Sequence, residues 1–123
     1  METLGTGAGA LRLRLQIGSA FQIRFLFRTY DSTTETYTDE DISGKTFSFT
    51  IWEYKGARKH LLNYTNQSGI TVPIYSTNEI LVNGLAADVT VTQEGEYYYE
   101  LRRTDLDQPK VFGPVDLTFD AKT

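Results

Sequence analysis

Few residues of this chain are of the types that carry out enzyme chemistry. There is one histidine, His60, and there is no cysteine. Acid–base catalysis by His60 would need an orienting carboxylate in a shared pocket, and the flanking sequence indicates none. The absence of cysteine excludes a disulfide, a thiolate metal site and a cysteine nucleophile. Because nucleotide-binding, serine hydrolase and zinc protease motifs are also absent, we expect no catalytic residue, no cofactor and no enzyme activity.

The densest group of potential metal ligands is the acidic segment 30–41, YDSTTETYTDED, which holds five carboxylates and no basic residue. Carboxylate oxygens are ligands for Ca²⁺, but the spacing is not that of an EF-hand. We therefore expect an exposed, solvated loop and no metal site, with Tyr30 and Tyr37 as its large side chains. The acidic turn around Asp105 and Asp107 receives the same interpretation.

Aromatic residues form the third group, with eight Tyr, seven Phe and one Trp. Trp52, Tyr54 and Tyr98 fall on the expected solvent-facing sides of their strands, where amphipathic rings are typical of protein interfaces and sugar-stacking sites. Alternatively, these rings pack beneath long loops. The sequence QEGEYYY has the Gly95-x-Tyr97 spacing of a tyrosine corner, so we expect Tyr97 to support the fold.

These groups must be positioned by β-strands, because apolar and polar residues alternate along most of the chain. The clearest predicted strands are 11–17, 21–28, 46–54 and 96–103. Weaker strands are expected at 59–64, 70–75, 80–82, 85–91 and 111–119. Gly18 either closes a hairpin or kinks a strand that crosses between two sheets. Asn83-Gly84 predicts a two-residue hairpin turn, and residues 85–88 are alternatively a single helical turn.

This pattern predicts an all-β fold, an antiparallel, immunoglobulin-like β-sandwich of about seven to nine short strands. A small barrel is the alternative. Residues 11–120 form the expected single domain. Residues 1–10 are rich in Gly, Ala and Thr and are interpreted as a flexible arm, either frayed or ordered on a neighbouring subunit, and residues 121–123 as a tail.

The net charge of −4 disfavours nucleic acid as a partner. No stretch approaches the ~18 apolar residues of a membrane span, and the first residues do not resemble a signal peptide, so we expect synthesis in the cytoplasm and no membrane contact. Residues 3–30 carry four Arg and no acid, next to the acidic segment. This asymmetry favours head-to-tail contact between copies, or else neutralisation within one subunit.

The order of motifs is similar to one phage protein family. The segments LRLQIGSAFQIRFLFRT, DISGKTFSFTIWE, SGITV, EGEYYYELRRTD and VFGPVDLTFD follow one another along the chain. Over about residues 11–120 this order resembles the immunoglobulin-like N-terminal domain of bacteriophage baseplate upper proteins and related small tail, baseplate or neck proteins. The resemblance assigns no catalytic residue and implies framework positions at Gly18, Asp41, Gly44, Gly95, Tyr97 and Gly113.

What the resemblance implies is a virion structural protein that assembles with other virion proteins, as a homo-oligomeric ring or trimer. The acidic segment is longer than the family's usual turn, and no fibre-forming extension follows residue 123, which suggests an adaptor, sleeve or decoration subunit. Our hypothesis places the contacts at Leu4, Tyr30, Tyr37 and Trp52. The alternative function is a carbohydrate-binding or adhesion module that uses Trp52 and Tyr54.

Overall fold

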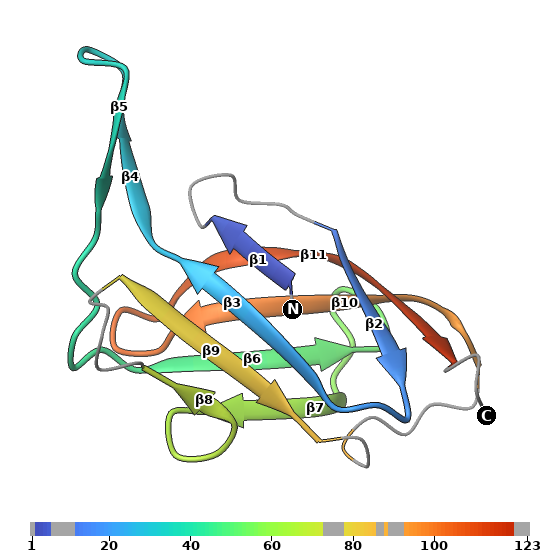
Figure 1. Cartoon of the computed structure of the whole chain (residues 1–123). Helices are drawn as coiled ribbons and strands as arrows, with labels where there is room; N and C mark the ends of the chain where they lie inside the picture. Colours follow the sequence, from blue (N-terminus) through green and yellow to red (C-terminus); the bar gives the residue numbers. More distant parts are fainter. Residues whose placement is uncertain (1, 6–11, 73–77, 86–87, 89–92, 120–123) are drawn as a thin grey trace.

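The computed structural model describes residues 2–5, 12–72, 78–85, 88 and 93–119, and for residues 2–5, Ile17 and Tyr30 it describes the backbone alone. These residues form two sheets and a separate hairpin (Figure 1). One sheet has the order β1 (Glu2–Gly5), β3 (Phe21–Leu26), β9 (Glu79–Gly84), β8 (Ile70–Thr71). The other has the order β2 (Leu13–Ile17), β11 (Gln108–Phe119), β10 (Gly95–Arg103), β6 (Phe47–Trp52), β7 (His60–Thr65). The hairpin pairs β4 (Arg28–Asp31) with β5 (Thr36–Asp39).

The two sheets pack face to face as an immunoglobulin-like sandwich, as the alternation predicts. Strands β11, β10, β6 and β7 are ordered like the G, F, C and C′ strands of a variable-type domain, and β3, β9 and β8 like B, E and D. All pairings are antiparallel except β1 with β3 and β2 with β11. The four-stranded and five-stranded sheets together reach the upper end of the expected strand number, and the hairpin adds two more strands.

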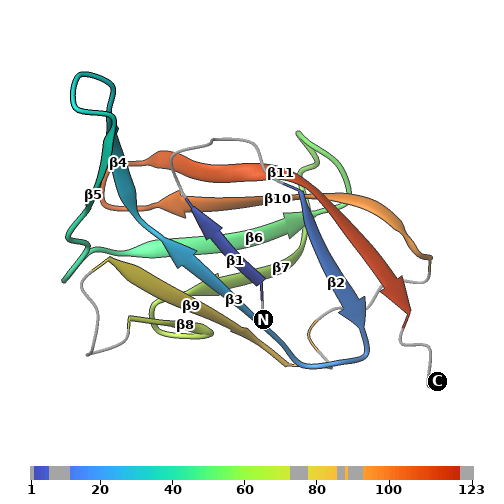
Figure 2. The same cartoon turned by 45° about the horizontal axis from the view of Figure 1, so that its top comes forward.

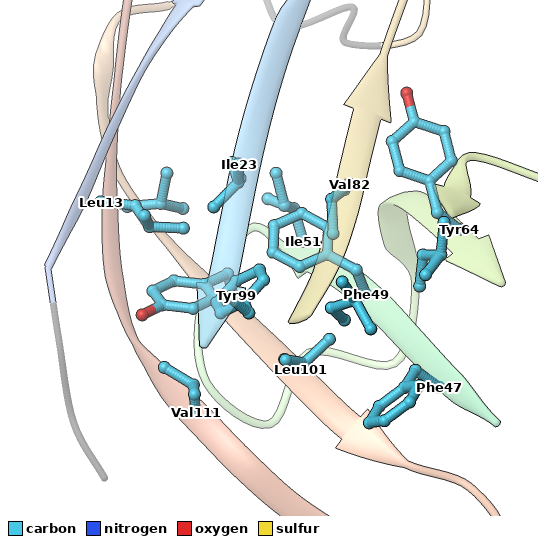
Figure 3. Close-up of a cluster of buried hydrophobic side chains, with 14 of the residues drawn as sticks. Leu13, Ile23, Phe47, Phe49, Ile51, Tyr64, Val82, Tyr99, Leu101 and Val111 are labelled. Atoms are coloured by element: carbon cyan, nitrogen blue, oxygen red, sulfur yellow. The ribbon is translucent and has the colours of Figure 1, made fainter. Parts of the chain in front are cut away.

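The core lies between the sheets, where side chains at every second position point inward (Figure 3). Aromatic rings link the two layers. The ring centroids of Phe25 and Phe49 are 6.1 Å apart, and those of Phe27 and Phe47 are 5.1 Å apart. The ring of Phe49 also packs against that of Tyr99, with centroids 5.9 Å apart. Each such side chain contributes about 1.5–3 kcal/mol on burial, so these rings provide much of the stability of a chain without disulfides.

The turn after β2 moves the chain from one sheet to the other. Gly18 has a φ of 86°, and the strands on either side of it, β2 and β3, belong to different sheets. Of the two interpretations of this glycine, the crossing between sheets is the one that the structure adopts. Leu13 and Leu15 consequently face the core from the five-stranded sheet, and Ile23 and Phe25 face it from the four-stranded sheet.

The predicted hairpin turn at Asn83-Gly84 is wrong. Both residues lie inside β9, where Asn83 pairs with Gln22 and Gly84 pairs with Phe21. A Cβ on Gly84 would lie 2.1 Å from Cε1 of Phe21, so this glycine makes room for a ring across the strand pair. The chain turns one residue later, where the Asp88 N–H donates to the Leu85 carbonyl (3.1 Å).

Part of the expected flexible arm is a strand. Residues 2–5 pair in parallel with β3, with Glu2 opposite Ile23 and Gly5 opposite Leu26. The free edge of β3 offers a row of backbone groups, and pairing with it satisfies them without requiring apolar side chains from the arm. Residues 6–10 lie outside the described residues, as does the side chain of Leu4.

Two more strand predictions need revision. The strand expected at 70–75 is only two residues long in β8, and its Pro73 lies outside the described residues. The segment 30–41, expected to be a loop, contains most of the β4–β5 hairpin. In the part of the chain that the structure describes, no helix is long and apolar enough to cross a membrane.

Candidate functional site

The β4–β5 hairpin projects away from the sandwich, as both views show (Figures 1 and 2). Residues 31–39 are all exposed, and Tyr37 retains 68% of its accessible surface. Backbone pairing places Tyr30 opposite Tyr37, and the side chain of Tyr30 lies outside the described residues. The hairpin therefore adds nothing to the core, although its alternating sequence and β-branched threonines favour a strand pair.

Specific contacts hold the base of the hairpin to the sandwich. The Glu40 N–H donates to the Phe27 carbonyl (2.9 Å), whereas the pair of Arg28 with the carboxylate of Asp39 (3.7 Å) joins the two strands of the hairpin to each other. Arg103, at the end of β10, contacts Glu40 at 3.4 Å and holds both oxygens of Asp105 at 3.0 Å. Arg103, which is only 8% exposed, therefore joins the residue after β5 to the turn after β10.

The acidic residues around the hairpin cap turns. Oδ1 of Asp31 accepts a hydrogen bond from the Thr33 N–H, and Oδ1 of Asp41 accepts one from the Ser43 N–H, each at 2.9 Å. These backbone bonds lower the pKa of both carboxyl groups. Within the described ranges, no cluster of three or more His, Asp or Glu side chains is arranged to hold a metal ion.

Charges are neutralised mostly within the subunit. Arg12 bridges Glu96 (3.0 Å) and Asp116 (2.7 Å), which raises the pKa of its guanidinium. Arg24 pairs with the buried Glu79 at 2.7 Å. Only Arg28 pairs with an acid of the hairpin. Mutual neutralisation of residues 3–30 and segment 30–41 is therefore limited, among the described residues, to the Arg28–Asp39 pair, and Arg12 and Arg24 pair with acids elsewhere in the subunit.

A second candidate site is a groove on the outer face of the five-stranded sheet, with a volume of about 520 Å³. We call it the outer groove. Residues 55–57 of the β6–β7 loop form one wall, and its strand residues are Ser48, Thr50, Trp52, Tyr98, Glu100 and Arg102. These residues come from β6 and β10, whose opposite faces carry the core, so the core itself fixes the floor of the groove.

The rings of Trp52 and Tyr98 lie side by side in the outer groove, with centroids 6.0 Å apart and planes inclined by 32°. Both side chains are partly exposed, as expected for outward positions. Tyr54, which is 61% exposed, lies in an adjoining hollow with Tyr97 and Pro114. The ring beside Trp52 is therefore that of Tyr98, and Tyr54 lies in the adjoining hollow.

Polar groups surround this aromatic pair. Nε of Arg102 donates to Glu100 at 2.8 Å, and its Nη1 donates to Asp107 at 2.8 Å, which together raise the pKa of Arg102. The Thr50 hydroxyl donates to Oδ1 of Asn63 at 2.9 Å. Partial burial, with a smaller effect of Glu100, raises the pKa of Tyr98. Its phenol is therefore a neutral donor at physiological pH.

The six framework positions can be described by their backbone angles and hydrogen bonds. The four glycines have positive φ angles: 86° at Gly18, 73° at Gly44, 158° at Gly95 and 149° at Gly113. At Gly44 this angle closes the turn in which the Lys45 N–H donates to the Ile42 carbonyl. Asp41 caps the same turn through Ser43. Tyr97 donates from its hydroxyl to the Gln93 carbonyl at 2.9 Å, the bond that the tyrosine-corner spacing predicts.

His60 is exposed at the start of β7, opposite Trp52 in the strand register. Sequence reasoning did not identify Glu100, Arg102 or Arg103 as site residues. The signal for the first two was present, because the alternation along β10 places them on the same side as Tyr98. Arg103 continues the inward-facing series Tyr99, Leu101, and a charged residue in that series indicates a buried ion pair.

Comparison with known proteins assigns the chain to no family. No protein-family model matches the chain, and a search of curated proteins also finds no match. Among solved structures, the chain is similar to the one described as the three-dimensional structure of the NK cell receptor Nkp44, a triggering partner in natural cytotoxicity. The two share 12% identity with a TM-score of 0.46, over 92% of this chain and 98% of that one.

Proposed function

We propose that this chain is a non-enzymatic structural protein of a bacteriophage particle that acts by binding other virion proteins and further copies of itself. The observation that carries the proposal is the β4–β5 hairpin. Its tip is exposed along residues 31–39, yet its base is tied to the sandwich by Arg103 and by the Glu40–Phe27 backbone bond. A directed hairpin that contributes nothing to its own core is suited to packing against a partner.

The chemistry of the hairpin indicates the kind of partner. Asp31, Glu35 and Asp39 make its surface acidic, and Tyr37 adds one large, exposed ring. Tyr is enriched at the centres of protein interfaces, and an acidic rim favours a partner with a basic surface. The resemblance in motif order supports a virion component as that partner. The virion is accordingly the proposed location, with the tail, baseplate, neck or a decoration layer as its possible parts.

The first test is the solution mass by size exclusion with light scattering, at two protein concentrations and two salt concentrations. We expect a discrete oligomer, a ring or a trimer, that loosens as salt screens the acidic contacts. A monomer under all four conditions would contradict self-assembly.

The second test shortens the hairpin. Replacing residues 30–37 by Asn-Gly joins Thr29 to Thr38 through a two-residue turn and keeps Arg28, Asp39 and Glu40. We expect this variant to fold and to be monomeric. Tyr54→Ser is the matched control, because Tyr54 is almost as exposed as Tyr37 but lies outside the hairpin. An oligomer that survives shortening would show that the hairpin is not the contact.

A further inference from the structure

The outer groove combines an aromatic surface with closely spaced donors and acceptors. Its rings, Trp52 and Tyr98, leave part of their surface open to solvent. The negative face of an aromatic ring attracts the polarised C–H bonds that line one face of a pyranose. Its volume of about 520 Å³ lies within the usual range of small-molecule sites.

The polar groups of the groove match hydroxyl groups. Glu100 provides carboxylate lone pairs, and the two bonds of Arg102 to Glu100 and Asp107 use two of the five N–H donors of its guanidinium. Thr50 donates its own proton to Asn63, so its oxygen faces a ligand as an acceptor. Lys55, in the β6–β7 loop that also lines the groove, supplies further donors. A sugar hydroxyl, which both donates and accepts, can bond with every member of this set.

Other occupants fit less well. An anion would meet Glu100, and a cation would meet Lys55 and Arg102. An added β-strand of a partner is excluded from this face, because β6 and β10 are inner strands whose backbone groups already pair on both sides. Charge and topology therefore both favour a neutral ligand that binds through side chains.

We propose that the outer groove binds a pyranose unit of an uncharged glycan, with the Trp52–Tyr98 pair as the stacking surface and Glu100 and Arg102 as the hydroxyl partners. This site is independent of the proposed assembly role, because it lies on β6 and β10 and shares no residue with the hairpin. Failure of one proposal leaves the other unchanged.

The test uses the only tryptophan of the chain as its reporter. The full chain is titrated with methyl glycosides of glucose, mannose and galactose while Trp52 emission is followed, and it is screened against immobilised neutral and sialylated oligosaccharides. We expect saturable binding of at least one neutral sugar, with a Kd on the order of 1 mM for a monosaccharide. No saturable binding, or binding of anionic glycans alone, would overturn the proposal.

Two variants locate the site. Tyr98→Ala removes the stacking surface, and Glu100→Gln keeps the shape while removing the charged acceptor. Each should weaken binding by about tenfold or more. Tyr54→Ala, in the adjoining hollow, is the control that should bind normally, and thermal melts of all three check folding. Binding that Glu100→Gln leaves unchanged in a folded protein would overturn the assignment.

Discussion

Strand β10 and the β4–β5 hairpin both carry tyrosines among polar residues, but only β10 has a second sheet to face. Tyr99 in β10 is fully buried, whereas Tyr37 in the hairpin is 68% exposed. The sequence predicts a strand at 96–103 and an exposed loop at 30–41, whereas the structure has strands in both places. What decides burial is whether the topology brings another apolar face against the strand.

This difference separates residues that maintain the fold from residues that are available for contact. A change in the inner face of β10 must be accommodated by a close-packed core. A change at the tip of the hairpin meets only solvent. This contrast can be tested by substitutions whose effects are measured as changes in stability or in local amide exchange.

The largest effect is expected for Tyr99→Ala against Tyr37→Ala. The first change leaves a cavity beside Phe49, with an expected loss of about 3–5 kcal/mol. The second should change stability by less than about 0.5 kcal/mol, because Tyr37 is exposed. Urea unfolding followed by Trp52 fluorescence measures both. Comparable losses would show that the hairpin is part of the cooperative core.

Gly69→Ala comes next. Gly69 has a φ of 97°, and a Cβ there would lie 2.6 Å from Cγ of Tyr64, whose ring is buried. Backbone strain and the displaced ring should together cost about 1–3 kcal/mol. Gly56→Ala is the control, since its φ of 89° carries similar strain but its Cβ meets nothing within 4 Å. Equal losses in the two variants would mean that the contact with Tyr64 is unimportant.

Arg103→Gln tests the junction between the two regions. Removing this nearly buried cation leaves Glu40 and Asp105 without their partner, with an expected loss of about 1–3 kcal/mol. Hydrogen exchange at the Glu40 amide should accelerate more than exchange in β10. Arg12→Gln, which breaks the exposed pairs with Glu96 and Asp116, should destabilise the protein much less. Unchanged exchange at Glu40 would show that Arg103 does not hold the hairpin.

Glu35→Gly should stabilise the protein. Glu35 adopts a φ of 53° in the turn of the hairpin, a conformation that costs non-glycine residues about 1 kcal/mol. Part of that strain is offset by the greater freedom of glycine in the unfolded chain, so the expected gain is about 0.5 kcal/mol. Thermal melts can detect it. In the comparison variant Asp107→Gly, at a φ of 52°, any gain should be reduced by the lost bond to Arg102.

As pH falls, the structure around the β4–β5 hairpin and its base should loosen before the rest of the domain. The pKa values of Asp31, Asp41 and Asp105 are lowered in the folded protein from a reference of 3.8, by backbone N–H groups for the first two and by Arg103 for the third. Their contribution is therefore complete above the unfolded pKa and lost as pH falls through the folded value. Amide spectra recorded from pH 6 to pH 2 should change first around these residues. Simultaneous loss of all signals would argue against local loosening.

The sequence predicts the sandwich well, because alternation is a local property that each strand carries in its own residues. The inward positions Phe47, Phe49 and Ile51 are buried as predicted, and Trp52 faces outward. The tyrosine corner was also predictable, since its hydrogen bond lies within the short segment 93–97.

What could not be predicted depends on contacts between distant residues. Asn83-Gly84 has the composition of a turn, and only the ring of Phe21 across the sheet explains the glycine. The parallel pairing of residues 2–5 depends on the free edge of β3, which no local pattern reveals. The outer groove likewise brings Trp52 beside Tyr98, two residues that are neighbours only through strand pairing.

The parallel pairing of β2 with β11 also determines the order of folding. Leu13 in β2 pairs with Val115 in β11, so this contact joins two residues that lie near opposite ends of the chain. Contacts of such long sequence separation are formed late, because a large loop must close before they add stability. The antiparallel β10–β11 hairpin closes locally and can form first, offering the edge on which β2 docks. We therefore expect the five-stranded sheet, and with it the closed sandwich, to be completed only after β11 has left the ribosome.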